Sequence, residues 1–283
     1  MPPQPPVPAA PWRALFLSGL EKSSASSFTL STIAHSNNPT KPPVPRARTV
    51  EFRGFFPKPA SSLHHSAIDA LKAQGIGMNP EVYESELFAI TTDRRMGKVG
   101  QIAGTVASGD RSSSASGEGE EAVEGVFWFE EGVMTQWRVR GKGVTIGGDR
   151  AGEEGVRERI FRRMRVVEGV DKHKASEEVK NWEWERQVST YFASHTPAMR
   201  GSYKNPTPGT PRSQDPSNPQ WKLNQKVEDL QDPAARENFR VLVILPYEVE
   251  RLDLSNPEDV RRTRWTFVED ENGGKWEELE LWP

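Results

Sequence analysis

The chain has 283 residues, a formal net charge of −3 and 35% hydrophobic residues, which is enough apolar material for one large domain or two small ones. The near-neutral charge argues against a protein that neutralises many nucleic-acid phosphates. No apolar run approaches the roughly 20 residues that span a bilayer, and the absence of cysteine excludes disulfides, thiolate metal sites and a cysteine nucleophile. The N-terminus lacks the basic and apolar regions of a signal peptide, so we expect a cytoplasmic protein without a membrane or nucleic-acid partner.

The first half of the chain is expected to be rich in strands. Residues 1–10 are proline-rich and are predicted to form a disordered tail. Trp12, Phe16 and Leu20 then recur at helical spacing, whereas later segments alternate apolar and polar residues as strands do. The predicted helices cover residues 11–23, 63–74 and 94–103, and the predicted strands cover residues 28–35, 46–55, 85–93, 124–131 and 135–148.

The second half is expected to insert two helices and then return to strands. The predicted helices cover residues 153–167 and 176–192, and the predicted strands cover residues 238–254, 261–270 and 274–283. Residues 106–121 form a polar, low-complexity insert that is expected to be flexible, and residues 203–222 form a long proline-rich loop. Strands at both ends with helices inserted do not follow the alternation of a doubly wound sheet. The order predicts a mainly β fold, a mostly antiparallel barrel with peripheral helices.

Several motifs that suggest binding sites lack the context that those sites need. The glycine-rich stretch 141–148 lies in a predicted hairpin and opens no helix, so it does not predict a dinucleotide site. Glutamates accompany the basic run 157–165, which fits a solvated helix face better than a nucleic-acid site. No pair of histidines has metal-ligand spacing with a nearby carboxylate, so no metal site is predicted.

Cationic and amide side chains gather where predicted strands begin or end. Such groups bind phosphate through charge-assisted hydrogen bonds, although solvated charges on edge strands give the same pattern. Arg48 and Arg53 are five residues apart and would face opposite sides of a regular strand, so they contact different groups unless a bulge intervenes. The members of this set are Arg48, Arg53, Arg95, Lys98, Gln101, Gln136 and Arg138.

Six segments in order resemble the pyridoxamine 5′-phosphate oxidase family, in its FMN-binding, oxidase-like branch. They are "FTLSTIA", "RARTVEFRGF", "ELFAITTDRRMGKVGQIA", "VFWFEEGVMTQWRVRGKGVTIG", "WEWERQVSTYFASHTPAMRGSYKNPTPGTP" and "NFRVLVILPYEVERLDL". The resemblance spans residues 11–283 apart from the polar insert. It implies a single FMN-binding split β-barrel domain that forms a homodimer with FMN at the subunit interface.

The resemblance also implies which residues contact FMN. The family pattern R-x-V-x-x-[KR] is matched by Arg48, Val50 and Arg53, and a later family segment is matched by Thr91, Thr92, Lys98 and Gln101. Gly97 replaces the arginine that usually precedes this lysine, and Arg95 is the expected substitute. The implied cofactor-binding residues are Arg48, Thr49, Val50, Arg53, Thr91, Thr92, Arg95, Lys98, Gln101 and Gln136.

The substrate side matches the family less well. The family segment Y-F-x-S-R-P resembles Tyr191 and Ser194, but His195 stands at the arginine position and Arg200 is the nearest replacement. The family element R-L-H resembles Arg251 and Leu252, with Asp253 replacing the histidine. The implied substrate-binding residues are Tyr191, Ser194, Arg200 and Arg251, and no catalytic residue is assigned.

These features favour an FMN-dependent oxidoreductase that resembles pyridoxamine 5′-phosphate oxidase and passes a hydride to flavin N5. Both replacements would weaken binding of a phosphorylated pyridoxal substrate. Two alternatives stay open: an FMN-dependent reductase of another small substrate, and a non-catalytic split barrel that binds flavin or haem.

Overall fold

The computed structural model describes residues 7–23, 26–36, 38, 40–103, 122–130, 132–148, 153–168, 177–270 and 273–283. The helices are α1 (Arg13–Lys22), α2 (His65–Ala73), α3 (Gly97–Ile102), α4 (Glu154–Arg162), α6 (Trp184–Ala193), α7 (Pro197–Gly201) and α8 (Pro233–Asn238), with 3₁₀ turns η1 (Ala60–Ser62) and η3 (Ser202–Lys204). The strands are β1 (Ser27–Ala34), β2 (Val44–Glu51), β3 (Phe55–Phe56), β4 (Tyr83–Glu84), β5 (Leu87–Asp93), β6 (Ala122–Phe129), β7 (Thr135–Ile146), β8 (Arg165–Val166), β9 (Phe239–Asp253), β10 (Arg261–Val268) and β11 (Lys275–Leu281).

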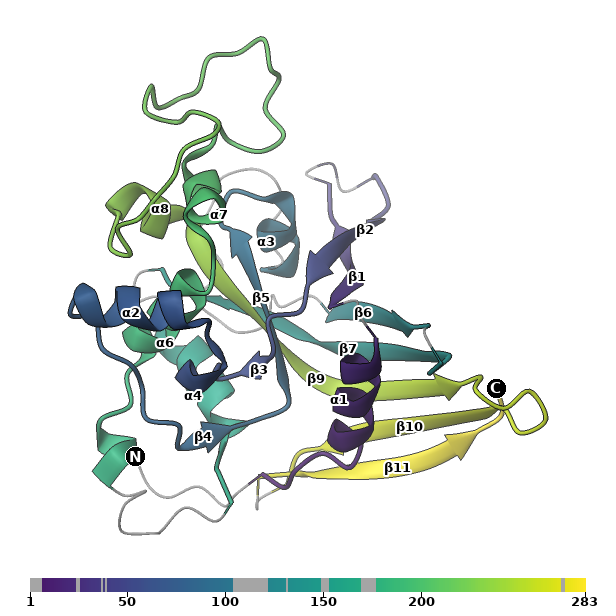
Figure 1. Cartoon of the computed structure of the whole chain (residues 1–283). Helices are drawn as coiled ribbons and strands as arrows, with labels where there is room; N and C mark the ends of the chain where they lie inside the picture. The colour runs from purple at the N-terminus through teal and green to yellow at the C-terminus, as the bar shows by residue number, and fades with distance from the viewer. Residues whose placement is uncertain are drawn as a thin grey trace.

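Nine of the strands form one antiparallel sheet in the order β11-β10-β9-β7-β6-β1-β2, with β5 paired to β9 and β3 paired to β5. The segment that follows β2 joins the two sides of this sheet. The amide of Arg53 donates to the carbonyl of Ala89 at 2.8 Å, and the amide of Ala89 donates to the carbonyl of Gly54 at 3.0 Å. The sheet therefore curls into a split β-barrel with peripheral helices, as predicted (Figure 1).

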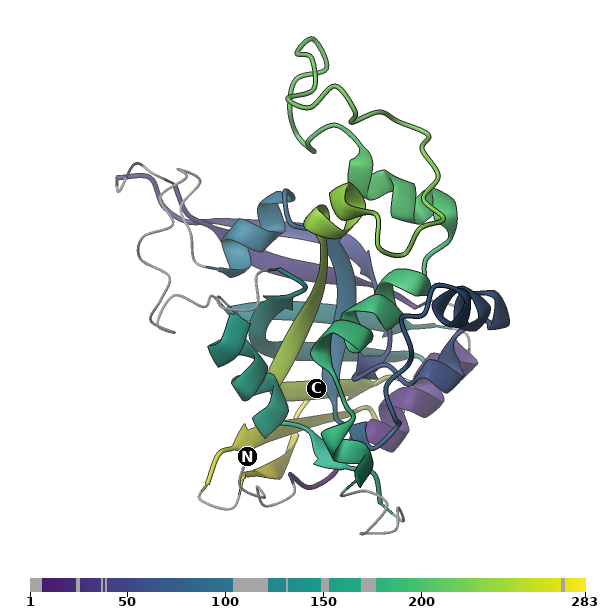
Figure 2. The same ribbon diagram turned by 90° about the vertical axis from the view of Figure 1, so that its left-hand side faces the viewer.

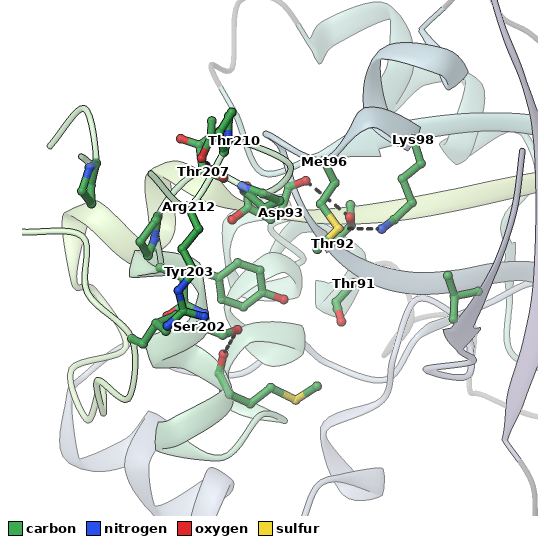
Figure 3. Close-up of a pocket in the computed structure, with 18 of the residues that line it drawn as sticks. Thr91, Thr92, Asp93, Met96, Lys98, Ser202, Tyr203, Thr207, Thr210 and Arg212 are labelled. Carbon is green, nitrogen blue, oxygen red and sulfur yellow. Dashed lines mark hydrogen bonds between the residues drawn. The ribbon is translucent and has the colours of Figure 1, made fainter. Parts of the chain in front are cut away.

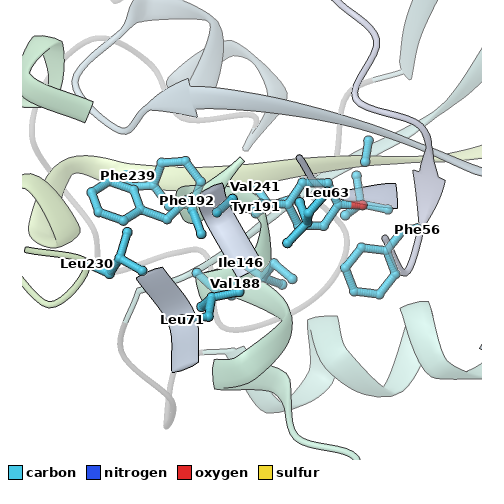
Figure 4. Close-up of a cluster of buried hydrophobic side chains, with 14 of the residues drawn as sticks. Phe56, Leu63, Leu71, Ile146, Val188, Tyr191, Phe192, Leu230, Phe239 and Val241 are labelled. Atoms are coloured by element: carbon cyan, nitrogen blue, oxygen red, sulfur yellow. The ribbon is translucent and has the colours of Figure 1, made fainter. Parts of the chain in front are cut away.

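Two apolar clusters pack on opposite faces of β5 and β9 because successive strand residues point to opposite sides. Leu87, Ala89, Val241 and Val243 belong to a cluster that α2 and α6 cover (Figure 4). Phe88, Ile90, Leu242 and Ile244 belong to the barrel-interior cluster. Burial on both faces explains why β5 and the first half of β9 read as continuous apolar runs rather than as alternating patterns.

Helix α1 packs into the barrel-interior cluster through its aromatic residues. The Phe16 ring centroid lies 5.1 Å from that of Phe127, 5.3 Å from that of Phe88 and 5.4 Å from that of Trp137, all in edge-to-face geometry. Trp12 stacks on Phe88 at 5.8 Å. The helical spacing of Trp12 and Phe16 thus reflects a core-facing stripe, and α1 lies across the sheet in Figure 1.

A bulge reverses the facing of β9 halfway along its length. The partner of Arg140 is Glu248 and that of Gly141 is Pro246, so one extra residue of β9 lies between these pairs. Pro246 has no amide hydrogen and suits this position. A Cβ on Gly141 would lie 2.5 Å from a backbone oxygen of β9, so only glycine allows this approach. Beyond the bulge, Val249 faces the barrel interior.

Several boundaries differ from the predicted ones. The strand expected at 46–55 ends at Glu51, because the chain leaves β1 there and crosses to β5. The helix expected at 176–192 has its well-formed part in α6, which begins at Trp184. The described structure begins within the predicted disordered tail: Val7 is 3% exposed and Ala10 is also buried. The predicted flexible insert at 106–121 lies outside the described residues.

The short elements β3, β4, β8, α7 and α8 were not predicted. Beyond η3, the predicted loop 203–222 contains turns but no helix or strand. It projects from the same end of the molecule as α7 and α8 (Figures 1 and 2). Within the described part of the chain, no helix combines the length and apolarity that crossing a bilayer requires.

Candidate functional site

A cavity of about 750 Å³ lies where β2, the end of β5 and the start of α3 face the segment from Met199 to Leu223 (Figure 3). Polar side chains line it on both sides, from the sheet and Lys98 of α3 on one and from residues 202–215 on the other. Its cover comes from the proline-rich segment 205–216. Six predicted cofactor-binding residues line the cavity: Thr49, Val50, Arg53, Thr91, Thr92 and Lys98.

Lys98 lines the cavity and lies close to a second cation, Arg48, outside it. Burial lowers the pKa of Lys98, and the nearby positive charge of Arg48 lowers it further, with a partial offset from Asp93. Burial and the charge of Arg46 lower the pKa of Arg48. Among the described residues, no carboxylate lies within ion-pair distance of Lys98 Nζ, whose partner is Met96 Sδ at 3.1 Å. An anion bound here would relieve the repulsion between the two cations.

Arg48 turns toward the end of the barrel rather than into the cavity. It lies opposite Leu30 of β1, so it shares the interior-facing side of the sheet. Its guanidinium donates to Thr32 Oγ1 at 2.6 Å and to Gln101 Oε1 at 2.8 Å, and Thr32 Oγ1 also donates to Gln101 Oε1. These contacts fix the side chain of Gln101 beside Arg48 and Thr32, outside the lining of the cavity. The predicted direct contacts of Arg48 and Gln101 with a cofactor stay predictions.

Arg53 is held by its backbone and leaves part of its side chain without a partner. Its amide pairs with Ala89, and its Nη2 lies 3.6 Å from Met199 Sδ. The Arg53 Nε is buried and has no hydrogen-bond partner among the described residues. Because Arg53 follows the end of β2, the alternation of a regular strand does not relate it to Arg48. The two arginines contact different groups in this chain.

Arg95 is committed to other contacts. It forms an ion pair with Asp93 at 2.6 Å, donates to the carbonyls of Tyr203 and Asn205, and lies over the ring of Trp221 at 4.6 Å. It therefore anchors the segment that covers the cavity. This differs from its expected role as substitute for the arginine replaced by Gly97.

Gln136 lies far from the cavity within one chain. Thr91 of β5 pairs with Val241, which pairs with Ile146 of β7. Gln136 is ten residues back along β7, which corresponds to about 30 Å of strand. It accepts a hydrogen bond from Arg138 Nε at 3.2 Å on the outer face of the sheet.

The four predicted substrate-binding residues are not gathered in the cavity. Tyr191 is fully buried and stacks on Phe56 at 6.1 Å, and Ser194 Oγ donates to the Tyr191 carbonyl. Arg200 donates to the carbonyls of Val227 and His195. In one chain these residues hold α6, α7 and residues 225–228 together, so a substrate role for them has no support from the cavity geometry.

Arg251 lies near the far end of β9, on the barrel-interior side. It forms an ion pair with Asp253 at 2.6 Å and lies 5.8 Å from the centroid of the Trp137 ring. Asp253 thus neutralises the cation that the resemblance assigns to substrate binding. Burial raises the pKa of Asp253, but hydrogen bonds from Ser255 and the charge of Arg251 outweigh it and lower the pKa below its ordinary value. The pair therefore stabilises the carboxylate in its charged form.

His195, at the position of the family arginine, is a neutral buried side chain. Burial, followed by the charges of Arg53 and Arg200, lowers its pKa to about 3. Its Nε2 lies 2.9 Å from Thr91 Oγ1, directly behind the cavity wall. The family's positive charge is therefore not reproduced at this position.

Sequence reasoning missed the far wall of the cavity. Met199, Tyr203 and Arg212 line it, and all follow α6 in a stretch whose composition indicates only a loop. Figure 3 places Tyr203 and Arg212 across the cavity from Lys98. The sole sequence signal was the Pro-Gly punctuation of residues 206–211, which predicts turns but not where the loop folds.

The comparisons with known proteins agree with this architecture. The family model described as pyridoxamine 5′-phosphate oxidase, FMN-binding domain, matches residues 9–147. No curated protein matches the sequence. A solved pyridoxamine 5′-phosphate oxidase-related, FMN-binding protein from Nostoc punctiforme is 18% identical with a TM-score of 0.53, over 98% of this chain and 100% of its own. PhzG from Burkholderia lata, in complex with tetrahydrophenazine-1-carboxylic acid, is 10% identical with a TM-score of 0.38, over 96% of this chain and 89% of its own.

Proposed function

Because residues 9–147 belong to the pyridoxamine 5′-phosphate oxidase FMN-binding family, whose cofactor is FMN, we propose that the cavity beside β5 holds this cofactor in an FMN-dependent oxidoreductase. The observation that carries the proposal is Lys98, a cation that lines a cavity with polar walls, has no carboxylate partner among the described residues and lies near the charge of Arg48. A dianionic phosphate is the natural partner of such a cation.

The residues present fit this cofactor. Lys98, which lines the cavity, would hold the phosphate, and the nearby positive charge of Arg48 would add to the attraction while its guanidinium stays bonded to Thr32 and Gln101. The hydroxyl of Thr92 and the guanidinium of Arg53, which also line the cavity, supply further donors. FMN has acceptor atoms at its phosphate, ribityl chain and ring edge, so a wall rich in donors suits it.

The role of the protein would be to bind and orient FMN and the substrate and to shield them from water. Bound FMN supplies the redox chemistry, since its N5 accepts a hydride from a substrate. Segment 205–216 covers the cavity and restricts the access of water, and Arg95 holds this cover in place through Asn205 and Tyr203. Met199 and Leu223 add apolar surface against which a small substrate can pack.

A homodimer with FMN at its interface belongs to the same proposal. Gln136 is about 30 Å of strand away from Thr91, so a glutamine contact with FMN has to come from the partner subunit's Gln136. Helix α6 covers the outer face of β9 near Val241, whereas the outer face near Glu250 carries exposed apolar side chains: Trp128 is 41% exposed and Leu279 is 51% exposed. A second copy covering this face would bury them.

The proposed substrate is a small molecule, and neither nucleic acid nor a membrane is a proposed partner. We do not assign a phosphorylated pyridoxal, because His195 is neutral and Arg251 is paired with Asp253. Purified protein loaded with FMN should bleach anaerobically with the true reductant. Pyridoxamine 5′-phosphate and NADPH, tested side by side, separate an oxidase of the family type from a reductase. Protein that takes up no FMN, or FMN that no reductant bleaches enzymatically, contradicts the oxidoreductase proposal.

The proposed dimer interface is tested by introducing a charge on the outer face of the sheet, at Trp128. Trp128→Glu should shift the protein from dimer to monomer in analytical ultracentrifugation and lower its FMN content. Leu15→Glu, an exposed apolar residue of α1, serves as the matched control and should leave both unchanged. A Trp128→Glu protein that stays dimeric with full FMN content contradicts the proposed interface. A cytoplasmic location, favoured by the lack of cysteine, completes the proposal and is checked by cell fractionation.

A further inference from the structure

Three side chains lie next to one another at one wall of the cavity. His195 Nε2 lies 2.9 Å from Thr91 Oγ1. Burial raises the pKa of the Tyr203 hydroxyl, and Thr91, as a donor toward this hydroxyl, partly offsets the rise. The rings of His195 and Tyr203 stack at 5.9 Å with an interplanar angle of 11°. Thr91 and Tyr203 line the cavity, and in Figure 3 the Tyr203 hydroxyl points toward Thr91.

The tautomer of His195 determines which side chain in this row donates a hydrogen bond and which accepts it. The Nδ1 of His195 is buried and has no partner among the described residues. A buried lone pair without a donor is tolerated better than a buried N–H without an acceptor, so the proton of this neutral ring belongs on Nε2. Nε2 then donates to Thr91 Oγ1. The Thr91 hydroxyl in turn has its proton available for Tyr203 Oη.

Tyr203 is consequently the end of the row. Burial is the main cause that raises the pKa of its hydroxyl, so the group keeps its proton. If Thr91 donates to Tyr203 Oη, the Tyr203 proton is left for an acceptor in the cavity. The Arg53 guanidinium belongs to the same neighbourhood, since its charge acts on both Tyr203 and His195. The Tyr203 hydroxyl is therefore a donor that this wall can offer to a ligand.

We propose that the Tyr203 hydroxyl, oriented by Thr91 and His195, donates the hydrogen bond that positions the substrate, and that this wall selects a small substrate with an sp² acceptor oxygen, as in a carboxylate or an amide. The proposal rests on the proposed function, because the substrate meets this wall in a cavity that FMN shares. The bound oxygen would take the place of the acceptor that Tyr203 lacks.

The test measures ligand binding to the full chain loaded with FMN, through perturbation of the flavin absorbance. The probes are nicotinate, nicotinamide and 3-methylpyridine, which share a ring and differ in the acceptor oxygen. In Tyr203→Phe, which keeps the ring, nicotinate or nicotinamide should bind about tenfold more weakly, the loss expected for one hydrogen bond. The affinity for 3-methylpyridine should not change. Tyr83→Phe, which removes a hydroxyl from β4, is the matched control and should alter none of the three.

Each outcome bears on the proposal. Unchanged affinity of Tyr203→Phe for both oxygen-bearing probes overturns it, as does equal weakening for all three probes or a wild type that does not prefer the oxygen-bearing ones. In each of these cases the protein still retains FMN, so the proposed function stands. A protein that retains no FMN overturns both proposals at once.

Discussion

Replacing His195 should change how the stability of the protein depends on pH. The unfolded chain has an ordinary histidine with a pKa of 6.5, whereas burial lowers the pKa in the folded chain to about 3. Between these two values, the unfolded chain binds a proton at residue 195 that the folded chain does not. Folding stability from this group is therefore complete above pH 6.5 and falls as the pH falls through this window.

The expected size follows from the gap between the two states. At pH 5 the pKa of the unfolded histidine, 6.5, is 1.5 above the pH, and a difference of one pH unit corresponds to about 1.36 kcal/mol. The free energy of unfolding should therefore be about 2 kcal/mol lower at pH 5 than at pH 7.5. The variant His195→Gln has an amide nitrogen that can replace Nε2 as donor to Thr91, and it does not titrate. The other ionisable groups are common to both proteins and cancel in the comparison.

Urea unfolding of FMN-free protein, followed by tryptophan fluorescence at pH 7.5 and pH 5, measures the difference. The wild type should lose about 2 kcal/mol more than His195→Gln between the two conditions. Equal losses would refute the assignment of a buried neutral histidine. An NMR titration of the wild-type imidazole is a second measurement, in which the His195 signal should keep its neutral shift at pH 5.

Two further predictions concern the stability of the fold. Glu86→Gln should destabilise the protein by about 3–5 kcal/mol in urea unfolding, because it removes the buried carboxylate that pairs with both Arg165 and Arg13 and leaves Arg165 only the more exposed Glu84. Glu280→Gln at an exposed ion pair should change stability by less than about 1 kcal/mol, and similar effects of the two variants would contradict the role of the buried pair. Gly141→Ala should lower stability by about 1–3 kcal/mol, since a Cβ would lie 2.5 Å from a backbone oxygen of β9. Gly155→Ala, within α4 and with no atom near its Cβ position, should instead be neutral or stabilise by up to about 1 kcal/mol, and a Gly141→Ala protein as stable as the wild type would show that the bulge tolerates a side chain.

The sequence predicted most of the fold because strand and helix periods were clear where one face is buried. Phe16 and Trp12 show helical spacing because both enter the barrel interior. The end of β2 was not predictable in the same way. The apolar residues of "VEFRGF" continue a strand-like pattern, but the chain changes partner from β1 to β5 at Arg53, and only the backbone pairing reveals this change.

The site could be predicted only in part, for physical reasons that differ between residues. Thr91 lies near the end of β5 and Lys98 in the helix that follows this strand, so local order places both in the cavity. The distance between Gln136 and Thr91 depends on the register of three strands, which one sequence does not reveal. Arg95 and its ion-pair partner Asp93 are close in sequence. The sequence did not reveal that Arg95 also binds the carbonyls of Tyr203 and Asn205 in a distant loop. Tyr203 belongs to that same segment, whose composition predicts turns and nothing about its position.

The most direct test of the central claim is the FMN affinity of Lys98→Gln, measured by quenching of flavin fluorescence. Lys98 lines the cavity and has no carboxylate partner among the described residues. Loss of one charged hydrogen bond to the phosphate, about 1.5–3 kcal/mol, should weaken FMN binding by roughly 10- to 100-fold. Lys72→Gln, an exposed lysine of α2, should bind FMN as the wild type does. Equal FMN affinity of Lys98→Gln and the wild type would contradict the placement of FMN in this cavity.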